Sequence, residues 1–144
     1  MSEQRLDIYL LKGRTRAEAH TFIAKLAGKS WRSGLKTVIW CDTEAEARVL
    51  DGVLWEVPPD AFLPHHLITE GPDLPVILLA FPGSPIPVSG CLVLTGATVP
   101  DQLNTERVAL VAANDEAALQ ASRKRYREFQ QQGYTAQVHD LRES

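Results

Sequence analysis

The sequence predicts an α/β protein in which a largely parallel sheet lies between two helical layers. Strand-like and helix-like segments alternate from Leu6 to Trp55, and such alternation favours parallel strands joined by helical crossovers. The run Thr37–Cys41 is nearly continuously apolar, as in an interior strand covered on both faces. With 144 residues, 44% of them hydrophobic, the chain is expected to form a single domain over residues 1–144.

The first unit is a strand followed by a helix. Leu6–Leu11 alternates and is rich in β-forming residues, and Thr15 with Glu18 three positions later forms a capping-box pattern. Gly34 stands where a left-handed C-terminal cap is wanted, so the helix is expected to run to Ser33. Its buried face follows the spacing of three and four and comprises Ala19, Phe22, Ile23, Leu26, Ala27 and Trp31.

The second unit repeats the pattern. The strand Thr37–Cys41 is followed by Thr43 and Glu46, a second capping box. Three apolar residues supply the inward face of this helix, which is expected to end near Trp55 because Pro58 and Pro59 cannot continue it. The three are Ala47, Leu50 and Leu54.

The segment Glu56–Pro75 is rich in proline, and its length indicates either a functional loop or disorder. Its hydrophobic residues Phe62 and Leu63 argue against disorder. Apolar runs then predict three strands, at Val76–Phe81, Cys91–Thr95 and Arg107–Ala112. A last helix is expected from Asn114, as its N-cap, to Gln132, with Gly133 ending it. Tyr134–Leu141 alternates and predicts a final edge strand.

Composition narrows the class of function. The formal net charge of -3 and the pI near 5.8 argue against a general duplex-binding surface, which needs a strongly basic domain. Residues 1–7 lack the basic region followed by an apolar run that a signal peptide requires, and no apolar stretch approaches the roughly 18 residues of a membrane span. We therefore expect a cytoplasmic protein that does not enter a membrane, with Cys41 and Cys91 as small buried side chains rather than a disulfide.

The expected layout is Rossmann-like, but the motifs of nucleotide chemistry are missing. The first strand-helix turn, residues 12–15, reads Lys-Gly-Arg-Thr and lacks the glycines that let a pyrophosphate approach. Gly28-Lys29-Ser30 resembles the end of a phosphate-binding loop, yet Ile23 replaces the first glycine of that motif. No cofactor is therefore expected.

The sequence gives equally little support for metal binding or nucleophilic catalysis. His65 and His66 are adjacent, and no further ligand stands at metal-binding spacing. Ser84 and Ser89 lack the surroundings of a catalytic nucleophile. We expect no metal and no catalytic residues.

Basic charge gathers on the last helix around Tyr126. The cations are Arg123, Lys124, Arg125 and Arg127. Arg123, Tyr126 and Arg127 share one helix face, and two guanidinium groups beside a ring suit carboxylates next to an apolar side chain. The alternative is plain packing with a solvated basic face, because a core-facing stripe runs through the same helix. That stripe is Leu119, Ser122, Tyr126 and Phe129.

Together these segments resemble the chi subunit family of bacterial DNA polymerase III over nearly the whole chain. The matching residues are Ile8-Tyr9-Leu10-Leu11, Trp31-Arg32-Ser33-Gly34, Cys41-Asp42 through Arg48, Leu50-Asp51 to Leu54-Trp55, Phe62-Leu63-Pro64-His65, Glu70-Gly71-Pro72, and Arg125-Tyr126-Arg127 followed by Gly133. They occur in the order and at the spacing of that family. The resemblance implies a non-catalytic accessory subunit that binds the psi subunit of the clamp loader on one side and the acidic C-terminal tail of single-stranded DNA-binding protein (SSB) on the other.

The resemblance also implies site residues. The family binds the tail, which ends in aspartates, a proline and a phenylalanine, through a basic residue, a tyrosine and a second basic residue, here Arg123, Tyr126 and Arg127. Val111 and Ala112, on the strand before that helix, are expected to wall the hole for the phenylalanine ring. Leu119 replaces a lysine that is frequent in the family, so Lys124 is a candidate for that extra charge.

For psi, the resemblance points to Trp55, Phe62, Pro64 and His65. An aromatic anchor is typical of interface cores, although Trp55 and Phe62 could instead pin the long segment to its own domain. DNA is expected to be contacted only indirectly. The rival functions are a direct binder of single-stranded DNA and a nucleotide-dependent enzyme.

Overall fold

Every strand pair of the sheet is parallel, as the alternation of strands and helices predicts. The computed structural model describes residues 4–56, 63–72, 76–86, 89–96, 98–101, 103 and 105–143. Its elements are β1 (Arg5–Leu10), α1 (Arg16–Arg32), β2 (Thr37–Trp40), α2 (Glu44–Glu56), β3 (His65–Leu67), β4 (Ile77–Ala80), β5 (Ser89–Leu94), β6 (Thr105–Ala112), α3 (Glu116–Gln131) and β7 (Thr135–Asp140). The seven strands lie in the order β3-β4-β2-β5-β6-β1-β7.

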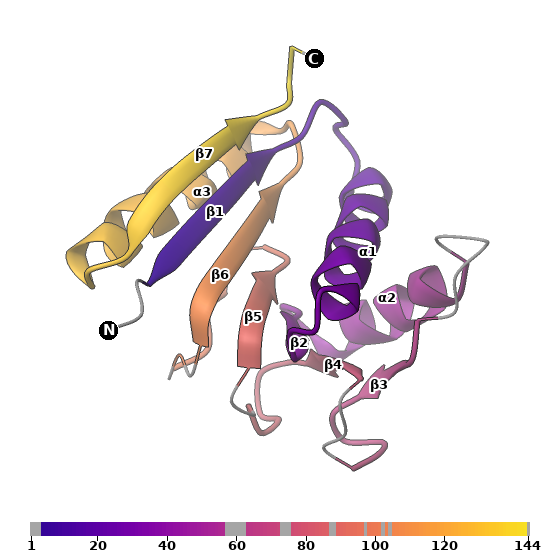
Figure 1. Ribbon diagram of the computed structural model, residues 1–144. Helices are drawn as coiled ribbons and strands as arrows, with labels where there is room; N and C mark the ends of the chain where they lie inside the picture. The colour runs from indigo at the N-terminus through magenta and orange to yellow at the C-terminus, as the bar shows by residue number, and fades with distance from the viewer. Residues whose placement is uncertain are drawn as a thin grey trace.

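Helices lie on both faces of the sheet but over different halves of it (Figure 1). The first two helices share one face, where α1 packs against β2, β4, β5 and β6, and α2 packs against β3 and β4. On the other face α3 packs against β6, β1 and β7. The three-layer α/β/α prediction is confirmed, and the sheet is wholly rather than largely parallel among the described strands.

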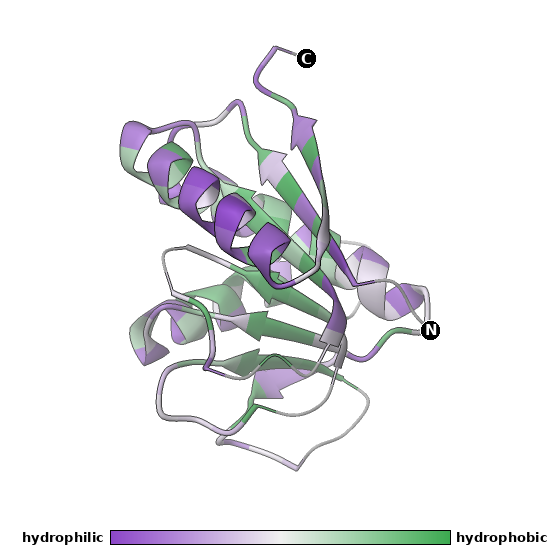
Figure 2. Cartoon of the chain, turned by 90° about the vertical axis from the view of Figure 1, so that its left-hand side faces the viewer, coloured by the Kyte–Doolittle hydropathy of each residue, from purple (hydrophilic) through white to green (hydrophobic). Residues whose placement is uncertain are grey.

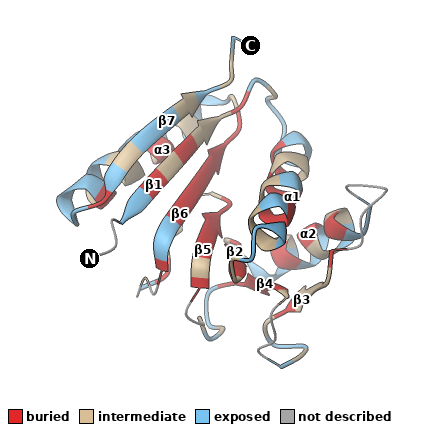
Figure 3. Ribbon diagram, in the orientation of Figure 1, coloured by how far each residue is buried: buried red, intermediate tan, exposed pale blue. Residues whose placement is uncertain are grey.

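The core has two parts, one on each face of the sheet, because successive residues of a strand point to opposite faces. Ile39 belongs to the part under α1 and α2, and its neighbour Val38 belongs to the part shared with α3. Strands β2 and β4 are buried throughout, whereas the edge strand β7 is largely accessible (Figure 3). Cys41 and Cys91 are buried free thiols whose pKa is raised by burial.

The helix caps lie at or within one residue of the positions that the sequence predicts. Thr15 is the N-cap of α1, and its hydroxyl accepts the backbone N–H of Glu18. Gly34 adopts the left-handed conformation that ends this helix, with a φ of 93°. The prediction for α3 is wrong by one residue, because the N-cap is Asp115, whose carboxylate accepts the N–H of Ala118, rather than Asn114.

The segment between α2 and β4 contains a strand that the sequence did not predict. His65–Leu67 forms β3 at one edge of the sheet, parallel to β4. Three residues are too few to show a period, and two of them are histidines, so pattern alone could not reveal this strand. Residues 57–62, including Phe62, lie outside the described residues. None of the described helices is both long and apolar enough to cross a membrane.

Candidate functional site

A groove of 350 Å³ runs between α3 and the two strands at the β7 edge of the sheet. Figure 2 looks onto this edge, with the mostly hydrophilic outer side of α3 beside the strands. The groove is lined by Ile8 and Leu10 of β1, Val138 of β7, and Ser122, Arg123, Tyr126 and Arg127 of α3. We call it the α3 groove. It brings together the three residues that the sequence placed on one helix face.

The floor of the α3 groove is apolar because of strand register. Ile8 lies directly beside Val138 in the parallel pair of β1 and β7, and both side chains face α3. Tyr126 is half-buried and packs against the core on this side of the sheet. The groove therefore offers an apolar surface that a small hydrophobic side chain could cover.

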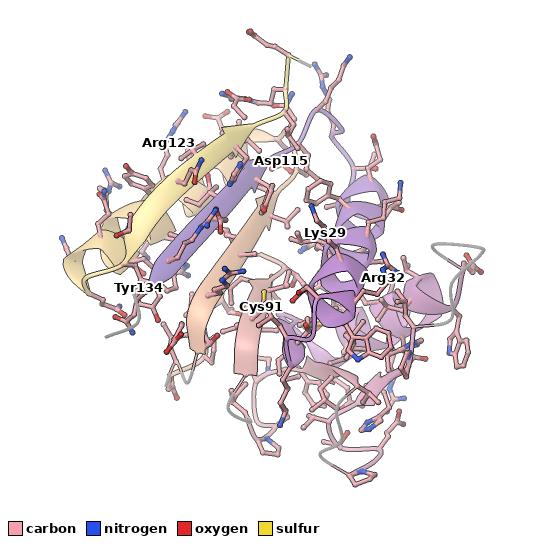
Figure 4. The ribbon with its side chains drawn as sticks, viewed as in Figure 1. Lys29, Arg32, Cys91, Asp115, Arg123 and Tyr134 are labelled. Atoms are coloured by element: carbon pink, nitrogen blue, oxygen red, sulfur yellow. The ribbon has the colours of Figure 1, made fainter. Side chains whose placement is uncertain are left out.

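The rim of the groove is cationic. Arg123 and Arg127 are exposed, and neither forms an ion pair with another described residue. Figure 4 shows Arg123 beside the β7 edge. Two solvated guanidinium groups above an apolar floor can bind carboxylates and an adjoining apolar group at the same time.

The other two cations of the helix lie elsewhere. Arg125 is mostly buried, with 17% of its side chain exposed, and pairs with Glu128 at 2.7 Å. Lys124 is exposed but does not line the α3 groove. The alternative of plain core packing holds for Ser122 and Phe129, which are buried. The helix thus uses one face for the core and a neighbouring face for the groove.

Val111 and Ala112 do not line the α3 groove, contrary to the expectation from sequence. Val111 points to the opposite face of the sheet and packs in the core under α1. Both residues border a separate pocket of 230 Å³ near the start of α3, to which Ser122 also contributes. Ala112 lies beside Leu10 in the sheet and so on the side of α3, but it lines only this separate pocket. The apolar wall of the α3 groove comes instead from β1 and β7.

The second predicted surface lies at the opposite edge of the sheet, around the end of α2. Trp55 is 60% exposed, and its ring packs edge-on against that of His65 at 5.0 Å. The side chain of His65 is fully buried, and its Nε2 lies 3.0 Å from the carbonyl oxygen of Asp51. Pro64 is half-buried. His65 therefore supports Trp55 from beneath, and Trp55 presents the accessible surface.

Exposed apolar side chains coincide with these two surfaces. The large hydrophobic residues that are exposed among the described part of the chain are Val49 at 54%, Trp55 at 60% and Val138 at 46%. Two of them lie on α2 and the third lies in the α3 groove. Single exposed apolar residues are ordinary, but Trp55 and Val138 each fall on one of the two surfaces described above.

A buried carboxylate at the carboxyl edge of the sheet was not predicted from sequence. Glu46 has 8% of its side chain exposed. It accepts hydrogen bonds from Arg16 at 3.0 Å, His20 at 3.0 Å, the N–H of Asp42 at 2.8 Å and the hydroxyl of Thr95 at 2.6 Å. The predicted capping box is half right, because Thr43 accepts the N–H of Glu46 while the carboxylate binds these other partners. Glu46 thus joins α1, α2 and the end of β5.

The partners of Glu46 make the stability of the fold depend on pH. Burial alone would raise the pKa of Glu46, but hydrogen bonds from His20, Thr95 and the Asp42 amide outweigh it and lower the pKa from 4.5 to about 2. Because the folded-state pKa is lowered, Glu46 stabilises the fold fully above its unfolded pKa of about 4.3. This contribution falls as the pH drops from there towards about 2.

Replacing Glu46 by glutamine is therefore expected to lower the free energy of unfolding at pH 7 by about 2 to 3 kcal/mol. The difference between wild type and variant should shrink as the pH falls from 4.3 towards 2. Urea unfolding followed by circular dichroism measures both. The control is Glu44→Gln, at a neighbouring side chain that is 52% exposed, with an expected change below about 1 kcal/mol. A Glu46→Gln difference that stayed constant with pH would contradict this explanation.

Comparison with known proteins identifies the family. The sequence model described as "DNA polymerase III chi subunit, HolC" matches residues 4–137. The DNA polymerase III subunit chi of Pseudomonas aeruginosa is 34% identical over 140 residues, which cover 95% of this chain and 96% of the relative. That of Haemophilus influenzae is 28% identical over 147 residues, covering 94% and 96%. That of Escherichia coli is 42% identical over 50 residues, or 35% of this chain and 34% of the relative. The chain belongs to the family of DNA polymerase III chi subunits and is an accessory subunit that takes part in DNA replication.

Proposed function

We propose that this chi subunit bridges two replication proteins without chemistry of its own. The α3 groove binds the acidic C-terminal tail of SSB, and the α2 surface around Trp55 binds the psi subunit of the clamp loader. The observation that carries the proposal is the apolar floor beneath two solvated arginines in the α3 groove. Carboxylate capture next to an apolar hole suits a C-terminal tail that ends in phenylalanine.

The binding free energy requires both parts of the groove. Exposed ion pairs contribute only about 0 to 1 kcal/mol each, so Arg123 and Arg127 alone would hold the tail weakly. Burying a phenylalanine side chain contributes about 1.5 to 3 kcal/mol. Ile8, Leu10 and Val138 supply the surface for it. The charges then orient the aspartates while the ring anchors the end of the tail.

Two neighbours modify the groove. Lys124 follows Arg123 on α3 and lies outside the lining, where it can meet an aspartate further from the terminus of the tail. Leu119, in place of a lysine, removes one charge from the same helix. Ala112, which borders the adjoining pocket, can contact only the part of the tail that passes Ser122, whereas the side chain of Val111 is buried on the other face of the sheet.

On the psi side, Trp55 is the anchor of the proposed interface. Aromatic side chains that enter a partner's pocket carry much of the energy of protein interfaces, and Trp55 is already 60% exposed. His65 packs beneath the ring of Trp55 and fixes its position. Pro64 precedes His65 in the sequence. Phe62, outside the described residues, remains a predicted member of this interface. The two surfaces lie at opposite edges of the sheet (Figure 1), so both partners can bind one chain.

The carboxyl edge of the sheet supports a non-catalytic role. In Rossmann-like proteins this edge holds the phosphates of a nucleotide. Here Arg16, Asp42 and Asp115 border the pocket at that edge. Arg16 is paired with Glu46 and Asp42, and the carboxylate of Asp115 occupies the N-terminus of α3, where a phosphate would otherwise bind.

The test is calorimetric titration of the chain with a synthetic peptide of the SSB tail. We expect saturable one-to-one binding that weakens as salt rises, because the arginines are exposed to screening. A peptide without the terminal phenylalanine is expected to lose at least about tenfold in affinity. Equal binding of the two peptides, or no binding of the complete one, would reject the groove as the tail site.

A further inference from the structure

A third surface lies on the side of the sheet that faces away from α3. Strands β6, β1 and β7 carry α3 on one face only, and in Figure 1 no described helix covers their other face beyond the flank of α1. The stacking of Tyr9 on His139, and the register of Arg107 beside Cys91 and Arg5, place these side chains on that uncovered side. We call it the open face; its residues are Arg5, Asp7, Tyr9, Arg107, Gln137 and His139.

The flank of α1 adds positive charge to the open face. Phe22 contacts Tyr9, with 5.3 Å between ring centroids, so the side of α1 that carries Phe22 borders the sheet. Lys25 and Lys29 stand three and seven positions after Phe22 and therefore share this side. Figure 4 shows Lys29 on the flank of α1 that is nearer to Cys91 of β5.

Three cations of the open face and the adjoining flank of α1 form no ion pair with any described residue. They are Lys25, Lys29 and Arg107, and all three are exposed. Two carboxylates lie among these cations. Asp7 is bound to Arg5 at 2.9 Å and to His139 at 2.8 Å, and Glu18, four residues before Phe22 on the same side of α1, accepts the hydroxyl of Thr15 at 2.9 Å. In a chain whose net charge is -3, this local excess of positive charge attracts an anionic partner.

The open face also carries aromatic rings. Tyr9 and His139 stack at 4.6 Å with an interplanar angle of 11°. One face of His139 is covered by Tyr9, and its side chain remains 27% exposed, so its outer face is accessible at the β7 edge. A ring next to a row of cations is the arrangement by which proteins bind single strands without reading their sequence.

We infer that the open face binds the backbone of single-stranded DNA directly, with Lys25, Lys29 and Arg107 on phosphates and His139 stacking on a base. An acidic peptide fits less well, because the accessible ring of His139 offers a stacking surface to a base, and the 400 Å³ pocket beside the open face is bordered by the carboxylate of Glu18. This inference does not depend on the proposed binding of the SSB tail. It places a different partner on the opposite face of the same strands.

The experiment is fluorescence anisotropy with a labelled oligothymidylate of about 16 nucleotides and the complete chain, without SSB or psi. We expect a dissociation constant on the order of 10 to 100 μM at about 50 mM salt, weakening steeply as salt rises. Lys29→Glu combined with Arg107→Glu should lower the affinity at least about tenfold and reduce the salt slope by about 2. The double variant should still bind the SSB tail peptide as the wild type does.

Lys124→Glu is the control. Lys124 is exposed on α3, which covers the opposite face of the same strands. Lys124→Glu should change the DNA affinity less than about twofold, because the contacts, and not the total charge of the chain, determine the loss. The inference is overturned if the wild type shows no binding at about 100 μM, or if the double variant binds as well as the wild type. It is also overturned if Lys124→Glu matches the loss, or if polyglutamate competes as effectively as DNA.

Discussion

Reversing both arginine charges of the α3 groove, with Arg123→Glu and Arg127→Glu together, is expected to lower the affinity for the SSB tail at least about 100-fold, equivalent to about 2.7 kcal/mol. The variant loses two attractive contacts and places two carboxylates against an acidic peptide. Arg127→Glu alone should cost at least about tenfold. Calorimetric titration with the tail peptide measures both losses.

The reversal is not expected to disturb the fold. Both arginines are exposed and form no ion pair with a described residue, so surface substitutions there should change stability by less than about 0.5 kcal/mol. Lys29→Glu with Arg107→Glu changes the net charge by the same amount on the opposite face and serves as the control. If that control lost as much tail affinity as the groove variant, the total charge of the chain and not the α3 groove would explain the binding.

Truncating the exposed tryptophan, Trp55→Ala, is expected to weaken binding of psi at least about tenfold, as loss of an aromatic anchor does. Trp55 is 60% exposed in the free chain, so most of its burial would occur only when a partner binds. Removing its edge-on contact with His65 should change the stability of the fold only slightly. Titration of psi with wild type and variant, followed by mass photometry or ultracentrifugation, measures the change.

Val138→Ala is the control for Trp55→Ala. Val138 is also an exposed apolar residue, at 46%, but it lies in the α3 groove at the other edge of the sheet. It should reduce tail binding and leave psi binding unchanged. Unaltered psi affinity in Trp55→Ala, with the fold intact, would show that Trp55 is an ordinary surface residue.

The parts of the fold that sequence could predict are those set by local chemistry. Thr15, Gly34 and the apolar faces of α1 and α2 follow from helix geometry and capping, which act within a few residues. The error at Asn114 is of the same kind, because two adjacent residues can both cap a helix and the carboxylate of Asp115 took the N–H of Ala118. Strand β3 was missed because it exists only through its pairing with β4.

The residues of the candidate site divide in the same way, into those set by local spacing along the chain and those set by the pairing of strands. Arg123, Tyr126 and Arg127 were predicted because a single helix carries them at the right spacing. The floor of the α3 groove depends on the pairing of β1 with β7, which sets Ile8 beside Val138. No pattern within either strand predicts that register, so the floor could not be predicted from the sequence. Choosing Val111 for the wall relied on its closeness in sequence to α3, whereas its side chain faces the other layer.

The buried carboxylate shows a similar limit. Glu46 stood in a capping position, and the sequence predicted only that local role. Its bonds to Arg16 and His20 of α1 and to Thr95 after β5 depend on three segments meeting at one edge of the sheet. Such contacts follow from the fold and not from the neighbourhood of the residue in the chain.

Whether one chain holds both partners at once is the most direct test of the bridge. The measurement is anisotropy of a labelled SSB tail peptide titrated with the chain alone and with its complex with psi. We predict the same dissociation constant in both titrations, and a higher anisotropy at saturation for the larger complex. Displacement of the peptide by psi would contradict the account, because it would place both partners on one surface.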